Sequence, residues 1–163
     1  MEKKQVIDQL LKQGSKKVSN LTVKNVTITP QQEYTRLALT LDKSVRGYHD
    51  DGSGKYEEGE VNVIFVSAFS VGSILKDDEE AAFAVNHLLT HPEGLGIILS
   101  RAKIDIIQEE VPAGTEYKNP FASDESKTTV FDHNSIVNHL INIEISDFGK
   151  TRLDRLADKL MGF

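Results

Sequence analysis

The stretch that decides the fold is LTVKNVTIT, residues 21–29. Leu21 and Val23 share one face of an extended chain, whereas the next apolar pair, Val26 and Ile28, falls on the opposite face. Successive side chains of a strand point to opposite faces, so in a regular strand only one of these two apolar pairs could face the core. An extra residue between the pairs would bring both to the same face. The pattern therefore predicts a β-bulge near Lys24–Asn25. A bulge bends its strand, which suits the first strand of a small barrel.

Four further segments have strand patterns. In residues 37–41 leucine alternates with other residues, which is typical of a half-buried strand. Residues 61–71 are almost continuously apolar, which indicates a strand covered on both sides, with Phe65 and Phe69 in the core. Alternation returns in two later segments, which predict the fourth and fifth strands at residues 102–106 and 140–146.

Helical patterns precede, interrupt and follow these strands. Residues 2–13 carry one apolar stripe and end before Gly14, as helices often do. The acidic run at 77–80 fits the first turn of a helix that continues to Pro92, where a second short helix begins. From Asp147 a last amphipathic helix is expected. The stretches 43–60 and 112–130 are expected to be long loops.

The order of these elements predicts the fold class. A helix, three strands, a helix, two strands and a helix give an α+β protein whose core is a five-stranded, OB-like, partly open β-barrel, with a helix between strands 3 and 4 and helices at both termini. We expect residues 1–163 to form a single domain. It would consist of an N-terminal helical arm at 1–17, a barrel core at 18–146 and a C-terminal helix at 147–163. A two-layer α+β sandwich is the alternative architecture.

Composition narrows the class of protein. The chain has 163 residues, which suits one domain, and no Cys, which excludes disulfide frameworks, thiolate zinc sites and thiol catalysis. We see neither a signal peptide nor a membrane-spanning segment, and expect no membrane partner. The net charge is −6, but residues 1–24 carry six Lys against two acids. A basic arm on an acidic body can contact phosphates or an acidic neighbouring surface, although a solvated helix face is the commoner explanation.

Metal and catalytic motifs are weak. His87 and His91 are four residues apart, so their rings share one helix face, and His133, His139 and Asp132 would complete a ligand set only if their loop folds back. The glutamate that a zinc hydrolase needs in His-Glu-x-x-His is missing. Histidines at a helix end are the commoner explanation. We therefore expect no metal, no other cofactor, no catalytic residues and a non-enzymatic protein.

The loop at 111–121 holds the best candidates for a protein contact. A Pro-Ala-Gly turn precedes the extended run Tyr117-Lys-Asn-Pro-Phe121. Aromatic side chains on such an arm are typical anchors for a pocket on the same molecule or on a neighbour. The predicted partner-binding residues are Tyr117, Asn119, Pro120 and Phe121, and the expected partners are other protein subunits of an assembly.

Two short stretches resemble known proteins. EYKNPF (116–121) and LADKLMGF (156–163) are similar to segments of small proteins from crAss-like tailed phages of gut Bacteroides-type hosts. The resemblance implies either a virion accessory protein, such as an auxiliary capsid protein, or a phage protein that binds single-stranded DNA. For a virion accessory protein, the resemblance implies a location in the virion, which is assembled in the host cytoplasm. For a protein that binds single-stranded DNA, it implies a location in the host cytoplasm. It transfers no site residues.

The second class has its own candidate residues. Proteins that bind single strands stack bases on aromatic side chains and follow the backbone with positive charge. The second strand and the loop after it would present such groups: Arg36, Lys43, Arg46, Tyr48, Lys55 and Tyr56.

Overall fold

The computed structural model describes residues 2–32, 34–50, 52, 56–121, 128–160 and 162, with only the backbone at residue 50. The chain divides into two compact units, which we describe separately. The first comprises residues 1–18, 45–61 and 107–139, and the second comprises residues 19–44, 62–106 and 140–163.

Thirteen elements follow one another in the part of the chain that the structure describes. They are α1 (Lys3–Lys12), β1 (Lys16–Pro30), β2 (Thr35–Asp50), β3 (Tyr56–Ser67), α2 (Ala68–Leu75), the 3-10 helix η1 (Ala82–Ala84), α3 (Val85–Thr90), α4 (Glu93–Leu99), β4 (Lys103–Val111), β5 (Glu116–Tyr117), β6 (Thr129–Val130), β7 (Ser135–Glu144) and α5 (Asp147–Leu160).

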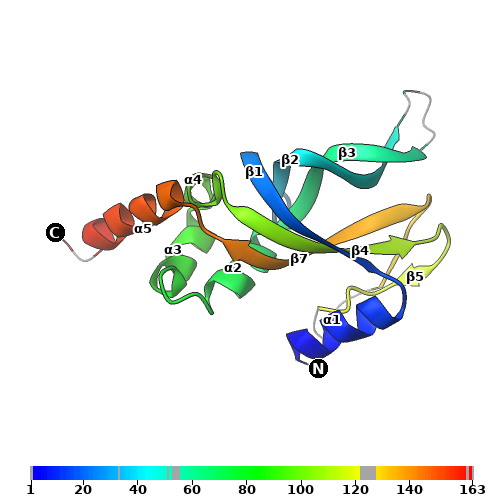
Figure 1. The fold of residues 1–163 in the computed structure, drawn as a ribbon, viewed down its shortest axis with the longest axis horizontal. Coiled ribbons are helices and arrows are strands. Elements are labelled where there is room, and N and C mark those ends of the chain that lie inside the picture. Colours follow the sequence, from blue (N-terminus) through cyan, green and yellow to red (C-terminus); the bar gives the residue numbers. More distant parts are fainter. Residues whose placement is uncertain are drawn as a thin grey trace. The chain divides into compact units, whose positions relative to one another are not determined.

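Five strands form one antiparallel sheet in the order β3-β2-β1-β4-β7, and β5 and β6 form a short hairpin (Figure 1). The predicted α+β class, the five strands and the helices at both ends are confirmed. The sheet is open, with β3 and β7 at its edges, so it is not a closed barrel. No helix in the described ranges is long and apolar enough to span a membrane.

The bulge in β1 is confirmed. β1 pairs with β2 in one register from Pro30↔Thr35 to Asn25↔Thr40, and the register then shifts before Val23↔Leu41. The shift returns Leu21 and Val23, 1% and 0% exposed, to the buried side. Because the bulge adds one residue to β1, Leu21 and Val23 can face the core of the second unit together with Val26 and Ile28.

The expected loop at residues 43–60 is wrong over most of its length. β2 continues to Asp50, and β3 begins at Tyr56. Val45 is buried, and across the ribbon Arg46 forms an ion pair with Glu58. Cross-strand pairs between polar side chains stabilise a ribbon that has little hydrophobic pattern, which is why the composition suggested a loop. The loop expected at 112–130 likewise contains β5 and β6, although residues 122–127 are not described.

The single strand expected at 61–71 is a strand followed by a helix. β3 ends at Ser67, whose hydroxyl accepts a hydrogen bond from the backbone N–H of Ser70 and so caps α2. Phe65 is 54% exposed and Phe69 is 74% exposed, so their assignment to the core is wrong. In β3 the side chains of Ile64 and Val66 take the buried face, which leaves Phe65 on the other.

The helices of the second unit provide much of its core (Figure 1). The acidic run forms a turn rather than a helical first turn, because the carboxylate of Asp78 accepts a hydrogen bond from the N–H of Glu80, 2.8 Å away. The helix after Pro92 and the last helix are confirmed. The largest fully buried side chains of this unit come from both sheet and helices: Leu21, Leu37, Leu39, Leu41, Ile64, Leu75, Leu88, Leu95, Leu99, Ile104 and Ile106.

Candidate functional site

Three polar side chains of the first unit meet at one carboxylate oxygen. Glu109 lies on β4, Tyr117 on β5 and His139 on β7. The Tyr117 hydroxyl donates a hydrogen bond to Oε1 of Glu109 over 2.7 Å, and Nε2 of His139 lies 2.9 Å from the same oxygen. His139 is only 6% exposed, so the cluster is fixed between strands rather than free at the surface.

The surroundings set the protonation of this cluster. Burial alone raises the pKa of Glu109, but hydrogen bonds from His139 and Tyr117 together with the His139 charge outweigh burial, and the pKa ends below its ordinary value. Burial raises the pKa of Tyr117, and its hydrogen bond to Glu109 and the charge of that carboxylate raise it further. The site therefore holds an ionised carboxylate against a phenol that keeps its proton.

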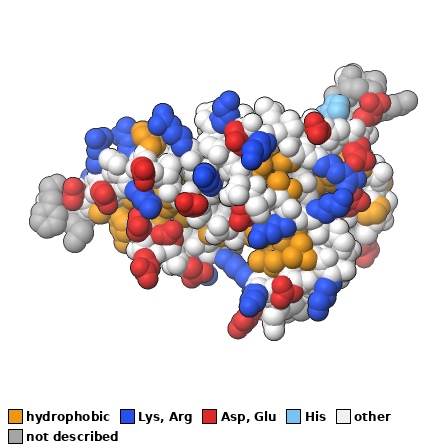
Figure 2. All heavy atoms as spheres, in the orientation of Figure 1, with side chains coloured by type: hydrophobic (Ala, Val, Ile, Leu, Met, Phe, Trp, Pro, Cys, Tyr) orange, Lys and Arg blue, Asp and Glu red, His pale blue; other side chains and the backbone are white. Residues whose placement is uncertain are grey.

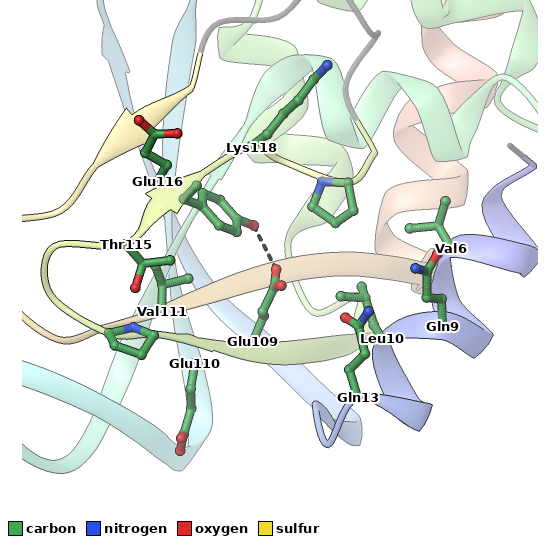
Figure 3. A pocket seen from close by; sticks show the side chains of 13 residues that line it. Val6, Gln9, Leu10, Gln13, Glu109, Glu110, Val111, Thr115, Glu116 and Lys118 are labelled. Atoms are coloured by element: carbon green, nitrogen blue, oxygen red, sulfur yellow. Dashed lines mark hydrogen bonds between the residues drawn. The ribbon is translucent and has the colours of Figure 1, made fainter.

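A cavity of about 370 Å³ lies beside this carboxylate. Val6, Gln9, Leu10 and Gln13 of α1 line one side, and Glu109 lies across from them (Figure 3). The lining is completed by the end of β4 and by the segment from Thr115 to Pro120. A carboxylate at the wall of a cavity with apolar and amide neighbours can orient one small polar ligand.

The four predicted partner-binding residues lie in the first unit, where three of them touch the cluster or its cavity. The Tyr117 ring is tilted against Phe131 at 5.7 Å, and the Phe121 ring lies 5.1 Å from His139. Pro120 lines the cavity. Asn119 is exposed, and its side-chain oxygen accepts a hydrogen bond from the N–H of Phe121. The rings of Tyr117 and Phe121 thus make contacts within the first unit. That they also bind a neighbouring subunit stays a prediction.

The residues predicted for nucleic acid fall into two groups. In the first unit, Arg46 forms ion pairs with Glu58 and Glu110, which compensates its charge. Tyr56 is stacked on His133 with ring centres 3.8 Å apart. Tyr48 of β2 is half-buried, and Lys55 lies outside the described residues.

In the second unit, Arg36 and Lys43 lie on β2. The Arg36 guanidinium lies over the exposed ring of Phe65, 4.8 Å from its centre. Lys43 is exposed and its Nζ donates to the backbone oxygen of Asn20 over 3.5 Å. A cation next to an exposed ring is the combination on which bases stack. This pair was missed from the sequence, because Phe65 was assigned to the core.

The rings of His87 in α3 and of His91, the residue that follows this helix, are stacked on each other and do not converge on a common point. The rings of His87 and His91 lie 4.4 Å apart and are inclined by 17°. Nδ1 of His91 lies 3.0 Å from the Thr90 hydroxyl and 3.1 Å from the backbone oxygen of His87. Within the described ranges, no group of three or more His, Cys, Asp or Glu side chains could hold a metal ion.

Comparison with known proteins gives no relative. No protein-family model, no curated protein and no solved structure matches this chain.

Proposed function

We propose that the protein is a non-enzymatic component of a macromolecular assembly, which binds neighbouring subunits through the second unit. The observation that carries this proposal is the exposure of Phe65 and Phe69, 54% and 74%, on either side of the β3–α2 junction. A phenylalanine buries roughly 150–250 Å² when it enters an interface, and large aromatic side chains of this kind dominate the energy of many protein contacts.

Further apolar side chains lie on the surface of the same unit. Tyr34, Ile97 and Leu160 are between 45% and 51% exposed. Hydrophobic side chains also gather on the face in view over α3 and α5 (Figure 2). Scattered exposed apolar residues are ordinary, but two strongly exposed phenylalanines four residues apart favour a contact with another protein.

The loop at 117–121 would add a second contact. Its hydrogen bonds and ring contacts within the first unit hold it in one conformation, which lowers the entropy cost of binding. Asn119, which is exposed, would then face the neighbour on a rigid arm. The assembly itself is proposed to be a phage virion, with the protein as an auxiliary capsid component. That step rests on the resemblance of residues 116–121 and 156–163 to small crAss-like phage proteins.

The test compares two sets of exposed phenylalanines. Particles of the encoding phage would be produced with the double variant Phe65→Ser, Phe69→Ser or with Phe83→Ser, an exposed phenylalanine of the same unit, as the matched control. Quantitative mass spectrometry of purified particles should show incorporation of the double variant reduced by about tenfold or more, since losing one hot spot costs roughly 2 kcal/mol or more. Phe83→Ser should be incorporated normally. Absence of the protein from wild-type particles, or equal incorporation of the double variant, would refute the proposal.

Binding of single-stranded DNA is the second candidate, and the Arg36–Phe65 pair favours it. A base could stack on this pair while Lys43 approaches the backbone. Titration with fluorescent oligo-dT at low salt should then show binding that weakens as salt rises, and Arg36→Gln should weaken it at unchanged fold. Binding that is lost with Arg36→Gln but retained with Phe69→Ser would favour DNA over protein as the partner of this surface. No binding at low salt would remove this candidate.

A further inference from the structure

The cavity beside α1 contains an acceptor that the protein leaves available. Among contacts between described residues, the two hydrogen bonds of the Glu109 carboxylate both fall on Oε1. Oε2 therefore keeps its capacity to accept a further donor. The side chain is 19% exposed, and Glu109 lines the cavity. A carboxylate that is partly withdrawn from water and held by two neighbours is oriented before any ligand arrives.

The walls fit a ligand with an apolar stem. Val6 and Leu10 lie opposite Glu109 on α1 (Figure 3) but are only 4% and 2% exposed. The aliphatic surface open to a ligand is therefore that of Pro120, which is half-buried and lines the same cavity. Gln9 and Gln13 supply amide oxygens that can accept hydrogen bonds near the carboxylate. The volume of about 370 Å³ lies at the small end of ligand pockets, which commonly measure roughly 300–1,000 Å³.

The charged residues that line the cavity favour a cation over an anion, even though His139 lies against Oε1 of Glu109. Three glutamates, Glu109, Glu110 and Glu116, line the cavity against one lysine, Lys118. Glu110 is paired with Arg46, and Glu116 points away from Glu109 (Figure 3), so Glu109 is the carboxylate best placed for a ligand. Because the pKa of Glu109 lies below its ordinary value, the carboxylate is charged at neutral pH. An anion would meet repulsion here, and a neutral apolar ligand would leave Oε2 without a partner.

We propose that this cavity binds an organic ammonium group on an aliphatic stem, with the ammonium donating to Oε2 of Glu109 and the stem lying against Pro120. The same chemistry is found in a free diamine and in the lysine side chain of another polypeptide. The proposal concerns a cavity of the first unit, whereas the test of the assembly function uses Phe65 and Phe69 of the second unit, so the two can fail separately.

Three probes test separately whether the ammonium charge is needed, whether the aliphatic stem alone binds, and whether the ligand is a lysine side chain or a free amine. N-acetyl-lysine amide and 1,4-diaminobutane carry the ammonium group, and N-acetyl-norleucine amide has nearly the same stem without it. Each would be titrated into the 15N-labelled full chain at neutral pH, with amide shifts followed at residues 109–118. We expect saturable shifts with the ammonium probes and none with the norleucine probe. Tighter binding of the lysine probe would indicate a polypeptide as the source, and tighter binding of the diamine would indicate a free amine.

Variants then assign the binding to Glu109. Glu109→Gln keeps the size of the side chain and removes its charge, and should weaken binding of the ammonium probes about tenfold or more, since a hydrogen bond to a charged group is lost. Glu116→Gln removes a lining carboxylate that points away and should change affinity by less than about twofold. Gln9→Trp would fill the cavity from α1 and leave Glu109 intact, and it should also abolish binding. This second variant keeps the proposal testable if Glu109→Gln does not fold.

Three results would overturn the proposal. They are shifts that do not saturate with either ammonium probe, equal binding of the norleucine probe, and unchanged affinity in both the Glu109→Gln and Gln9→Trp variants.

Discussion

The guanidinium of Arg36 lies 4.8 Å from the centre of the Phe65 ring, and this ring is 54% exposed on an edge strand. Its chain neighbour Ile64 is 0% exposed. One step along β3 thus separates a core residue from a surface residue, although both are large and apolar. The contact with Arg36 covers part of the ring and leaves the rest available for a partner.

Substitutions at these neighbours should differ strongly in their effect on stability. Phe65→Ser should change the free energy of unfolding by about 1 kcal/mol or less, because it removes a surface ring and one cation–π contact. Ile64→Ala should cost roughly 2–5 kcal/mol, because it opens a cavity in the core of the second unit. Urea denaturation of both variants checks this expectation. A loss for Phe65→Ser as large as that for Ile64→Ala would show that Phe65 is a core residue after all.

The hydroxyl of Tyr117 should contribute to stability through Glu109. Tyr117→Phe keeps the ring against Phe131 but removes a donor to a charged acceptor, so the free energy of unfolding should fall by roughly 1.5–3 kcal/mol. Tyr34→Phe is the matched control, because Tyr34 is 51% exposed and should tolerate the change. Urea denaturation gives the loss, and hydrogen exchange at residues 107–121 should rise in Tyr117→Phe alone. Equal behaviour of the two variants would argue against the bond.

Acid should weaken the first unit through Glu109. The pKa of this carboxyl is lower in the folded protein than its ordinary value, so the folded state favours the ionised form. That stabilisation is complete above the unfolded pKa of about 4.3, and is lost as the pH falls through the lower folded value. The difference in Tm between wild type and Glu109→Gln should therefore be largest near neutral pH. It should shrink as the pH falls below the unfolded pKa of about 4.3 and through the lower folded value. A difference that is independent of pH would contradict this assignment.

Two glycines in helices of the second unit should respond differently to a methyl group. A Cβ at Gly149 of α5 would lie 2.6 Å from the backbone oxygen of Ile98, whereas a Cβ at Gly96 of α4 would meet its nearest atom at 3.7 Å. Gly149→Ala should therefore cost roughly 1–3 kcal/mol through overpacking. Gly96→Ala should be neutral or stabilise the protein by up to about 1 kcal/mol, because alanine favours the helix. Thermal unfolding of both variants measures the contrast, and a destabilised Gly96→Ala would contradict the described packing of α4.

Much of the secondary structure could be predicted from local patterns. The bulge was predicted from the change of face between Val23 and Val26, because the alternation of side chains along a strand is visible within a short stretch of sequence. The first helix, the helix after Pro92 and the last helix were equally visible. The polar ribbon of residues 43–60 was missed, since its stability comes from pairs across strands, such as Arg46 with Glu58.

The sequence by itself determined the α+β class, the five strands of the main sheet and the bulge in β1, because these follow from periodicity and turn residues within short windows. Only the tertiary structure decided that the sheet stays open, that Phe65 faces outward and that Glu109, Tyr117 and His139 share one carboxylate oxygen. His139 is 30 residues from Glu109 in the chain. Strand pairing brings such residues together, and no local pattern records which distant strands become neighbours.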